Sequence, residues 1–416
     1  MTKEQNKKAP NLRFKGFTND WEQRKLKEVK DVRDGTHNSP KYQREGYPLV
    51  TSKNLVTNGI DLSEVSFISK YDYQEINKRS KVETGDILFG MIGTIGNPVM
   101  VKKGGFAIKN VALIKHGGEV SNGFLLYLLK SSTFLQYIRK ENAGGTQKFL
   151  GLSVIRSFKF KVPDKVEQGK IASIFNILNR LITLQQRKLE LLKEIKKGLL
   201  QKMFADKSKF PILRFEGFHA EWEQRKLGDI IKVSGGVPFK PSDYISNGLA
   251  TIPKSSVNES GKANLRDAKQ VSIKFKSKQN SLVYNGDIIT SLRDLVPTAP
   301  NLGRVVQIDG TRTVYILSQG VYSLKANSNY VTKQFMVEYS NTPRYRNEIY
   351  KIKNGSTQVH IRSGQYLNIA ISIPNISEQV KVSKLLKIIN ISITLQQRRL
   401  TKLNSIKKSL LQQMFI

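Results

Sequence analysis

Two short polar loops carry residue types that suit the binding of nucleic acid. The first loop contains Gly144, Gly145, Thr146, Gln147 and Lys148, and the second contains Gly355, Ser356, Thr357 and Gln358. Glycine lets the backbone approach a phosphate, Ser and Thr hydroxyls can bond phosphates or bases, and a Gln amide can pair with adenine. These loops are therefore candidate DNA contacts, and an ordinary turn between a helix and a strand is the alternative interpretation.

Four basic residues are further candidates for binding DNA. Lys53 and Lys254 lie 201 positions apart and align in the internal repeat described below, so both could hold a phosphate or reach a base. Solvated surface lysines are the alternative for this pair. Arg293 and Arg362 have no basic counterpart in the first half of the chain at the same offsets. They are therefore candidates for reading a target that the first half does not read.

A catalytic centre is not evident in the sequence. The glycine-rich loop 90–96 lacks the Lys and Ser/Thr of a phosphate-binding loop, and it also lacks the spacing of a dinucleotide fingerprint. The chain has no cysteine, and its four histidines are not spaced as a metal pair. His37 lies in the turn-like segment 34–40 and could point into a site, although a turn histidine is the simpler interpretation. We expect no catalytic, metal or cofactor site.

The composition indicates a polyanionic partner. The 416 residues include 69 Lys+Arg against 33 Asp+Glu, which gives a formal net charge of +36 and a pI near 10.1. The basic residues are spread along the chain, so a wide charged surface is expected instead of a disordered tail. Nucleic acid is the leading candidate and an acidic membrane surface the second. Without a signal peptide or an apolar run of about 20 residues, a soluble cytoplasmic protein is expected.

The chain contains an internal repeat that is confined to two segments. Residues 182–204 and 393–415 are identical at 16 of 23 positions, and residues 10–26 and 211–227 at 12 of 17. The two inserts between these segments share only short similarities. Trp21 and Trp222 recur in the constant segments and are expected to anchor each domain. What both copies keep is predicted to be framework, and what differs is predicted to read a target.

Two helices of about forty residues are predicted at the ends of the inserts. Asp164 with Glu167, and Asn375 with Glu378, fit a capping box at each start. Apolar residues then recur near seven-residue spacing, with Gln185 and Gln396 as single interruptions. At about 1.5 Å per residue each helix would measure about 60 Å. We expect the two helices to pair antiparallel as a coiled coil; packing of each helix on its own domain is the alternative.

Each insert is predicted to mix strands and helices. The segments 158–163 and 369–374 have the pattern of strands, and 124–140 and 331–350 each have the pattern of one amphipathic helix. The motif GDI recurs at an offset of 201 and TQ at an offset of 211, which predicts one extra ten-residue loop in the second insert. The fold class is α+β, with recognition domains at 1–163 and 205–374 and long helices at 164–204 and 375–416.

The combined motifs resemble the specificity subunit of type I restriction-modification systems. The shared segment K-K-x-L-L-Q-x-M-F at 196–204 and 407–415, and the opening L-R-F-x-G-F at 12–17 and 213–218, carry the resemblance over essentially the whole chain. Residues 34–42 and 234–244 are similar to two variants of the opening of a target recognition domain in this family. The resemblance implies two target recognition domains on a helical coiled coil with pseudo-two-fold symmetry.

The resemblance also implies the function and the partners. Each domain would read one half of a split, asymmetric site in double-stranded DNA, while the helix pair sets the gap. The chain itself would do no chemistry. Two modification subunits would methylate adenine with S-adenosylmethionine, and restriction subunits would translocate and cut DNA with ATP and Mg. A nonspecific architectural DNA-binding scaffold and a DNA-modifying enzyme acting alone are the alternatives. The sequence does not give the bases of either half-site.

Overall fold

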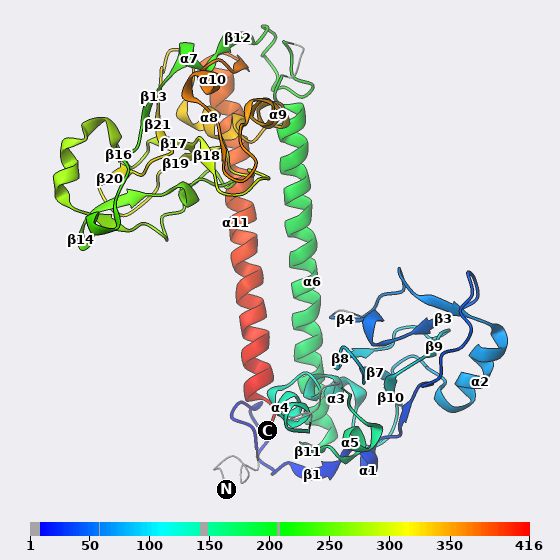
Figure 1. Ribbon diagram of the computed structural model, residues 1–416. Helices are drawn as coiled ribbons and strands as arrows, with labels where there is room; N and C mark the ends of the chain where they lie inside the picture. Colours follow the sequence, from blue (N-terminus) through cyan, green and yellow to red (C-terminus); the bar gives the residue numbers. More distant parts are fainter. Residues whose placement is uncertain (1–8, 58, 142–148, 206–208) are drawn as a thin grey trace. The chain divides into compact units, whose positions relative to one another are not determined.

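A computed structural model describes residues 9–57, 59–141, 149–205 and 209–416 of the chain (Figure 1). The chain forms two compact units, the first made of 1–186 with 399–416 and the second of 187–398. Each unit contains one insert and one part of each long helix. In the described ranges we find no helix with the length and apolar character needed to cross a bilayer.

The first unit is built on small sheets with the orders β2-β10-β7-β8, β6-β3-β9, β1-β11 and β4-β5. Its strands are β1 (Glu22–Lys25), β2 (Val32–Asp34), β3 (Tyr47–Val50), β4 (Leu55–Val56), β5 (Gly59–Ile60), β6 (Ser66–Ile68), β7 (Ile87–Gly90), β8 (Gly96–Met100), β9 (Ala107–Ile108), β10 (Val111–Ile114) and β11 (Lys159–Val162). Its helices are α1 (Leu26–Val29), η2 (Ser52–Asn54), α2 (Lys70–Ser80), α3 (Asn122–Leu128), α4 (Ser132–Glu141), α5 (Leu152–Ser157) and the start of α6 (Lys165–Lys202).

The second unit has a related plan with the sheet orders β13-β21-β17-β19, β15-β14-β20-β16, β12-β23 and β18-β22. Its strands are β12 (Glu223–Lys226), β13 (Ile231–Gly235), β14 (Tyr244–Ile252), β15 (Gln270–Val271), β16 (Leu282–Tyr284), β17 (Ile288–Ser291), β18 (Arg293–Asp294), β19 (Val305–Gln307), β20 (Val314–Leu317), β21 (Val321–Ala326), β22 (Val359–His360) and β23 (Ala370–Ile373). Its helices are α7 (Leu227–Ile230), η3 (Pro241–Asp243), η4 (Lys254–Ser256), η5 (Ile273–Ser277), η6 (Gln279–Ser281), α8 (Lys333–Tyr339), α9 (Pro343–Ile352), α10 (Ser363–Leu367) and the start of α11 (Ile376–Gln413).

The constant segments form a frame that closes each insert. β1 pairs antiparallel with β11 in the first unit, and β12 pairs with β23 in the same way in the second. The strands expected at 158–163 and 369–374 are therefore confirmed. Trp21 and Trp222 are 4% and 1% exposed, which confirms them as core anchors of their domains.

The start of each long helix is fixed by two interactions. The carboxylate of Asp164 accepts a hydrogen bond from the backbone N–H of Glu167 at 2.9 Å, and Asn375 does the same for Glu378. Of the two hydrogen bonds in a capping box, only the one from the glutamate backbone N–H to the cap side chain is confirmed. The glutamates do not reach back to the cap, because each instead forms a buried bidentate ion pair with the arginine of the L-R-F motif. The constant opening is thereby attached to the helix that follows the insert.

The two long helices run antiparallel where each unit shows them together. In the first unit, Ile171 and Phe175 near the start of α6 share a core with Met414 and Phe415 after α11. In the second unit, Leu200 and Met203 near the end of α6 share a core with residues at the start of α11. The expected antiparallel pairing of the two long helices is confirmed. The alternative, in which each helix packs on a domain, also holds where the helix ends enter the domain cores. Leu181 and Ile195 remain exposed, because a pair buries only the strip that faces the partner.

The single amphipathic helix expected in each insert is wrong. Residues 122–141 form two helices, α3 and α4, and residues 333–352 form α8 and α9. The break has a local cause, since the hydroxyl of Ser131 donates to the carbonyl of Leu128 at the end of α3. In the second insert Thr342 caps α9, and Pro343 occupies its first turn. Proline fits a helix start and interrupts a helix interior.

The single ten-residue loop expected in the second insert is also wrong. The equivalent bonds Gly85 N to Val101 O and Gly286 N to Ile308 O show the offset growing from 201 to 207 between β7 and β8. Most of the difference therefore lies in the loop between β17 and β19. The offset reaches 211 only at α3 and α8. The other four inserted residues are therefore spread over the three connections that lie between β8 and α3 in the first unit.

Candidate nucleic-acid interface

A cleft in the second unit brings together three of the residues singled out from the sequence. Lys254, Arg293 and Gln358 line a cavity of about 270 Å³, together with Asp294, Leu295, Val359 and His360. Arg293 lies on β18, which pairs with β22 so that Arg293 is opposite His360. The three polar side chains come from η4, the β17–β19 loop and the loop before β22. We call this cavity the cationic cleft.

A glycine and a hydrogen-bonded loop position the side chains that line the cationic cleft. Gly320 has φ of +90°, and a Cβ there would lie 3.2 Å from Cδ of Arg293 and 3.3 Å from Cε of Lys254. Glycine at this position therefore leaves room for both side chains to pack against the backbone. The carboxylate of Asp294 accepts hydrogen bonds from the backbone N–H groups of Val296 and Asn301, at 3.3 and 3.1 Å. The only acidic side chain of the cleft is thus engaged with its own loop.

The side chains of the cationic cleft are available to a ligand. Among the described residues, none forms a hydrogen bond or ion pair with the side chains of Lys254, Arg293, Gln358 or His360. An arginine with five free N–H donors, next to a free lysine and a free amide, suits a polyanion with exposed acceptor atoms. This chemistry matches the groove of a DNA duplex.

The loop before β22 is a tight turn with its polar residues at the tip. Asn354 and His360 exchange two backbone hydrogen bonds of 2.9 Å, and Gly355 has φ of +95°. Ser356 and Thr357 are exposed on this turn. Arg362 is exposed immediately before α10 and does not line the cationic cleft. DNA binding by these three residues stays a prediction.

The corresponding loop of the first unit lies outside the described residues. It contains the candidates Gly144, Gly145, Thr146, Gln147 and Lys148. The described residue that follows, Phe149, forms an antiparallel bridge with Ile92. The neighbouring bond from Leu150 N to Met91 O, at 2.9 Å, matches that from Ile361 N to Leu292 O, at 3.0 Å. The pair Ile92–Phe149 is therefore the structural equivalent of Arg293–His360.

The alignment of Lys53 with Lys254 at an offset of 201 is wrong. The equivalent bonds Lys109 N to Val50 O and Ser318 N to Ile252 O give an offset of 202 at this strand. Ser52 therefore occupies the position of Lys254, and its hydroxyl bonds the carbonyl of Asn110 at 3.2 Å. Lys53 is exposed on η2, and its contact with DNA stays a prediction.

The first unit has its own polar cleft, which the sequence indicated only through His37. A cavity of about 400 Å³ is lined by Thr36, His37, Asn38, Glu75, Ile76, Arg79 and Ser80. The imidazole of His37 bonds Asn110 and Asp34, both at 2.8 Å, and Arg79 pairs with Asp34 at 2.7 Å. His37 is thus held by its neighbours at the edge of a cleft. Arg79 was missed, because a basic residue near the end of a helix has no distinguishing sequence signal.

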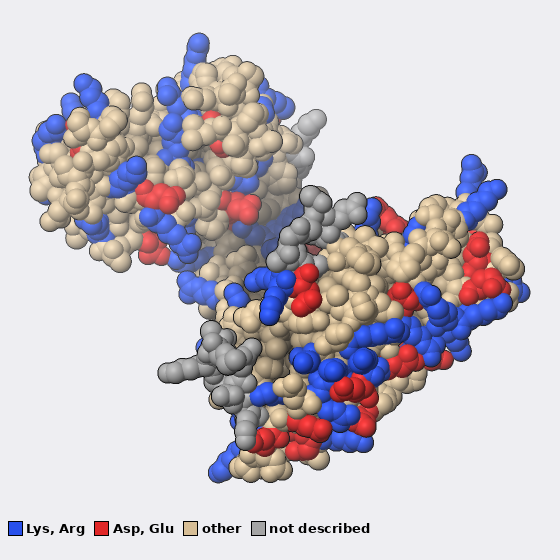
Figure 2. Space-filling view, turned by 60° about the horizontal axis from the view of Figure 1, so that its bottom comes forward, with Lys and Arg blue, Asp and Glu red and all other residues tan. Residues whose placement is uncertain are grey.

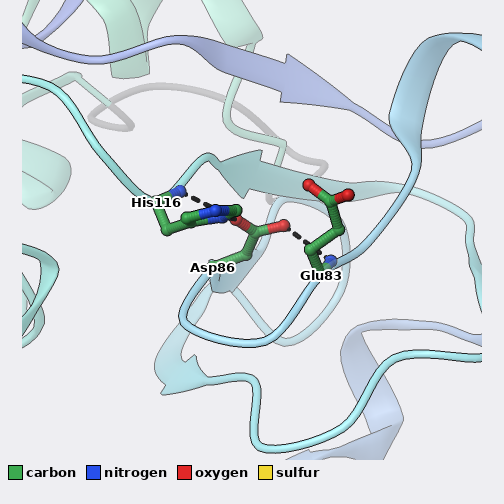
Figure 3. A group of neighbouring side chains, drawn as sticks. All are labelled: Glu83, Asp86 and His116. Atoms are coloured by element: carbon green, nitrogen blue, oxygen red, sulfur yellow. Dashed lines mark hydrogen bonds and ion pairs between the residues drawn. The ribbon is translucent and has the colours of Figure 1, made fainter.

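One group of side chains has the composition of a metal site but is already neutralised by a lysine. Glu83, Asp86 and His116 place their ligand atoms within 4.8 Å of one another (Figure 3). The ammonium of Lys115 lies 2.6 Å from Asp86 and 2.8 Å from Glu83. Burial opposes the charge of Lys115, yet the hydrogen bonds to these carboxylates raise its pKa. Asp86 also accepts the backbone N–H groups of Glu83 and His116, so the cluster joins β7 to the end of β10.

Basic side chains are distributed over the domains. Figure 2 shows Lys and Arg across the visible face of the described residues, with Asp and Glu among them. This distribution agrees with the wide charged surface expected from the net charge of +36.

The comparisons with known proteins point to one family. The model of the family described as type I restriction modification DNA specificity domain matches residues 18–194 and 219–405. The type I restriction enzyme MjaVIII specificity subunit of Methanocaldococcus jannaschii is 24% identical over 374 residues, which cover 88% of this chain and 85% of the relative. The putative type I restriction enzyme MjaX specificity subunit of the same organism is 24% identical over 409 residues, covering 94% and 92%.

Solved structures show the same fold. The S subunit of a type I restriction-modification system from M. genitalium superposes with a TM-score of 0.62 at 14% identity, covering 98% of this chain and 99% of that one. A chain from a study of complex assembly and conformational transition of the type I system gives 0.54 at 16% identity, covering 94% and 96%.

Proposed function

The chain belongs to the family of type I restriction-modification DNA specificity subunits, and we propose that its two units read the two halves of one bipartite, asymmetric DNA site. The support is the pair of related folds with different exposed chemistry at equivalent places. The cationic cleft of the second unit has Arg293, where the first unit has Ile92. Two readers of the same sequence would not need this difference.

The long helices would set the gap between the half-sites. α6 and α11 each contain 38 residues, so each rises about 57 Å at about 1.5 Å per residue. Removing one seven-residue repeat from both helices, 183–189 and 394–400, keeps the apolar seam in register. We expect this double deletion to shorten the preferred gap by about three base pairs, since about 10 Å of helix is lost. Both half-sites should be unchanged.

Chemistry would reside on partner subunits. We propose that two modification subunits methylate adenine with S-adenosylmethionine and that restriction subunits cut DNA using ATP and Mg. The support is family membership together with the free polar groups of the cationic cleft, which offer hydrogen-bond donors to DNA. The chain would select the site and would bind none of these cofactors itself.

Methylation mapping in cells that carry this chain with its modification subunits tests the proposal. The expected result is methylated adenine in one split motif with a fixed gap. A nonspecific architectural scaffold would give no motif. Methyl transfer by the purified chain without partners would instead favour an enzyme acting alone.

A further inference from the structure

We propose that one exposed cross-strand pair determines a base in each domain: Arg293–His360 selects guanine in the second half-site, and Ile92–Phe149 selects thymine in the first. The proposal rests on the proposed function, because it assigns bases to the two half-sites.

Backbone equivalence makes the two pairs comparable. Arg293 faces His360 between β18 and β22, and Ile92 faces Phe149 in the same bridge of the first unit. Both bridges follow the strand that begins at the isoleucine of the GDI motif. Each bridge is also next to a matched backbone bond, from Leu150 N to Met91 O in the first unit and from Ile361 N to Leu292 O in the second. The frame thus presents the same two positions to the outside in each domain. Only the side chains differ.

Guanine fits the second pair because of the donors that Arg293 carries. Its guanidinium has donors and no acceptor, and described residues leave it unpaired. In the major groove guanine presents two acceptors side by side, O6 and N7, whereas adenine offers an acceptor and a donor. The arginine fork therefore matches guanine with two bonds and adenine with one. Lys254, which also packs against Gly320, would bind the adjacent phosphate.

Thymine fits the first pair because neither side chain can donate or accept a hydrogen bond. Ile92 is 38% exposed and Phe149 is 49% exposed, although both are large and apolar. Single exposed apolar residues need no explanation, but here two of them face each other across one bridge. The thymine C5 methyl is the apolar group on the major-groove edge of the bases. An apolar pair at this position would therefore favour thymine.

Arginine substitutions in the assembled methyltransferase complex test the guanine assignment. Methylation mapping with Arg293→Ala should make one guanine of one half-site degenerate, and preference for that guanine should fall about 5- to 150-fold, as expected for a lost bidentate contact. Arg293→Lys should weaken the preference less than Arg293→Ala, because a lysine can still donate to O6 and N7 but lacks the planar fork. Lys254→Ala is the matched control and should weaken binding to all sequences equally. The melting temperature of each variant should be unchanged, since these side chains have no described partners.

The transplant Ile92→Arg with Phe149→His tests the equivalence of the two positions. The other half-site should change at one position, from thymine to guanine, while the second half-site stays as it was. The proposal is overturned if Arg293→Ala leaves the motif unchanged, weakens all sequences uniformly, or alters both halves. It is also overturned if the wild-type half-site that Arg293 affects has no guanine. Absence of any bipartite motif with the wild-type chain would instead reject the proposed function.

Discussion

The two domains keep the same frame and place different chemistry on it at equivalent positions. Both frames tie an arginine to a glutamate at the start of a long helix, and both bury a tryptophan. At the exposed cross-strand pair, the first domain is apolar and the second is cationic and polar. Side chains that hold the fold are thus separated from side chains that face outward. A domain of this design can change its target without rebuilding its core.

A smaller difference lies where the long helices meet the domains. In the first domain Lys130 is mostly buried near Lys407, and burial with the nearby positive charge lowers the pKa of Lys130 to about 8. In the second domain Asn341 replaces Lys130, and Glu338 lies near Lys196, the counterpart of Lys407. Glu338 accepts from Asn390 as Tyr127 accepts from Asn179. The second domain therefore has a carboxylate and one lysine where the first has a phenol and two lysines.

Loss of the frame arginines should have the largest effect. Arg13→Met and Arg214→Met each leave a buried glutamate, and breaking a buried ion pair costs about 3–5 kcal/mol. Arg214→Met should cost more, because Glu167 keeps a hydrogen bond from the indole N–H of Trp21, whereas the indole N–H of Trp222 has no partner among the described residues. The difference should be about 1 kcal/mol.

Denaturant unfolding followed by tryptophan fluorescence measures this difference domain by domain. The chain has two tryptophans, so Trp222→Phe leaves a reporter in the first domain and Trp21→Phe leaves one in the second. The control Arg214→Met with Glu378→Gln should recover part of the loss. Equal costs in the two domains would show that the Trp21 bond contributes nothing.

Lys130→Met should stabilise the first domain by an amount on the order of 1 kcal/mol at neutral pH. The pKa of Lys130 is about 8 in the folded chain against 10.5 as its ordinary value, so between these values the unfolded chain binds more protons. Wild-type stability therefore rises with pH across that window. The increase in the free energy of unfolding caused by Lys130→Met should be complete below pH 8 and should disappear as the pH approaches 10.5.

Thermal unfolding across this pH range, followed through Trp21, checks the prediction for Lys130. The matched control is Lys27→Met, which replaces an exposed lysine of α1 and should change the melting temperature little at any pH. A loss of stability in Lys130→Met at pH 7 would mean that the charge has an anionic partner.

The smallest effect is expected for a phosphate contact of the cationic cleft. Lys254→Ala should reduce the slope of log binding constant against log salt by about 0.9, the value for one phosphate. Lys276→Ala is the control, because Lys276 is exposed on η5 and does not line the cleft. Salt titrations of the complex, on a duplex that contains the target site and on an unrelated duplex, give one slope for each duplex. A change confined to the matched duplex would make Lys254 a base contact.

The sequence predicted the frame well because its signals are local. Asp164 and Asn375 mark the helix starts, and alternating residues mark β11 and β23. Within the inserts a constant offset fails, since insertions of one to six residues shift the alignment. Lys53 was matched with Lys254 for this reason, although Ser52 occupies the equivalent place. The breaks at Ser131 and Thr342 were missed because short capping interactions interrupt otherwise continuous amphipathic patterns.

The cationic cleft could be predicted only in part. Arg293 and Gln358 stood out because they differ between the copies or lie in a polar loop. Their meeting with Lys254 depends on the pairing of β18 with β22 and on the close approach over Gly320, which connect segments far apart in the chain. The Ile92–Phe149 pair could have been found from the offsets of 201 and 211. Residue type alone does not distinguish an exposed apolar residue from a core residue.

Exchange of one insert tests most directly whether the two domains read independently. Residues 31–160 would be replaced by the corresponding insert of another specificity subunit, and the methylated motif would be mapped in cells with the modification subunits. One half-site should change, while the other half-site stays the same and the gap is retained. A change in both halves would contradict the separation of frame and reader.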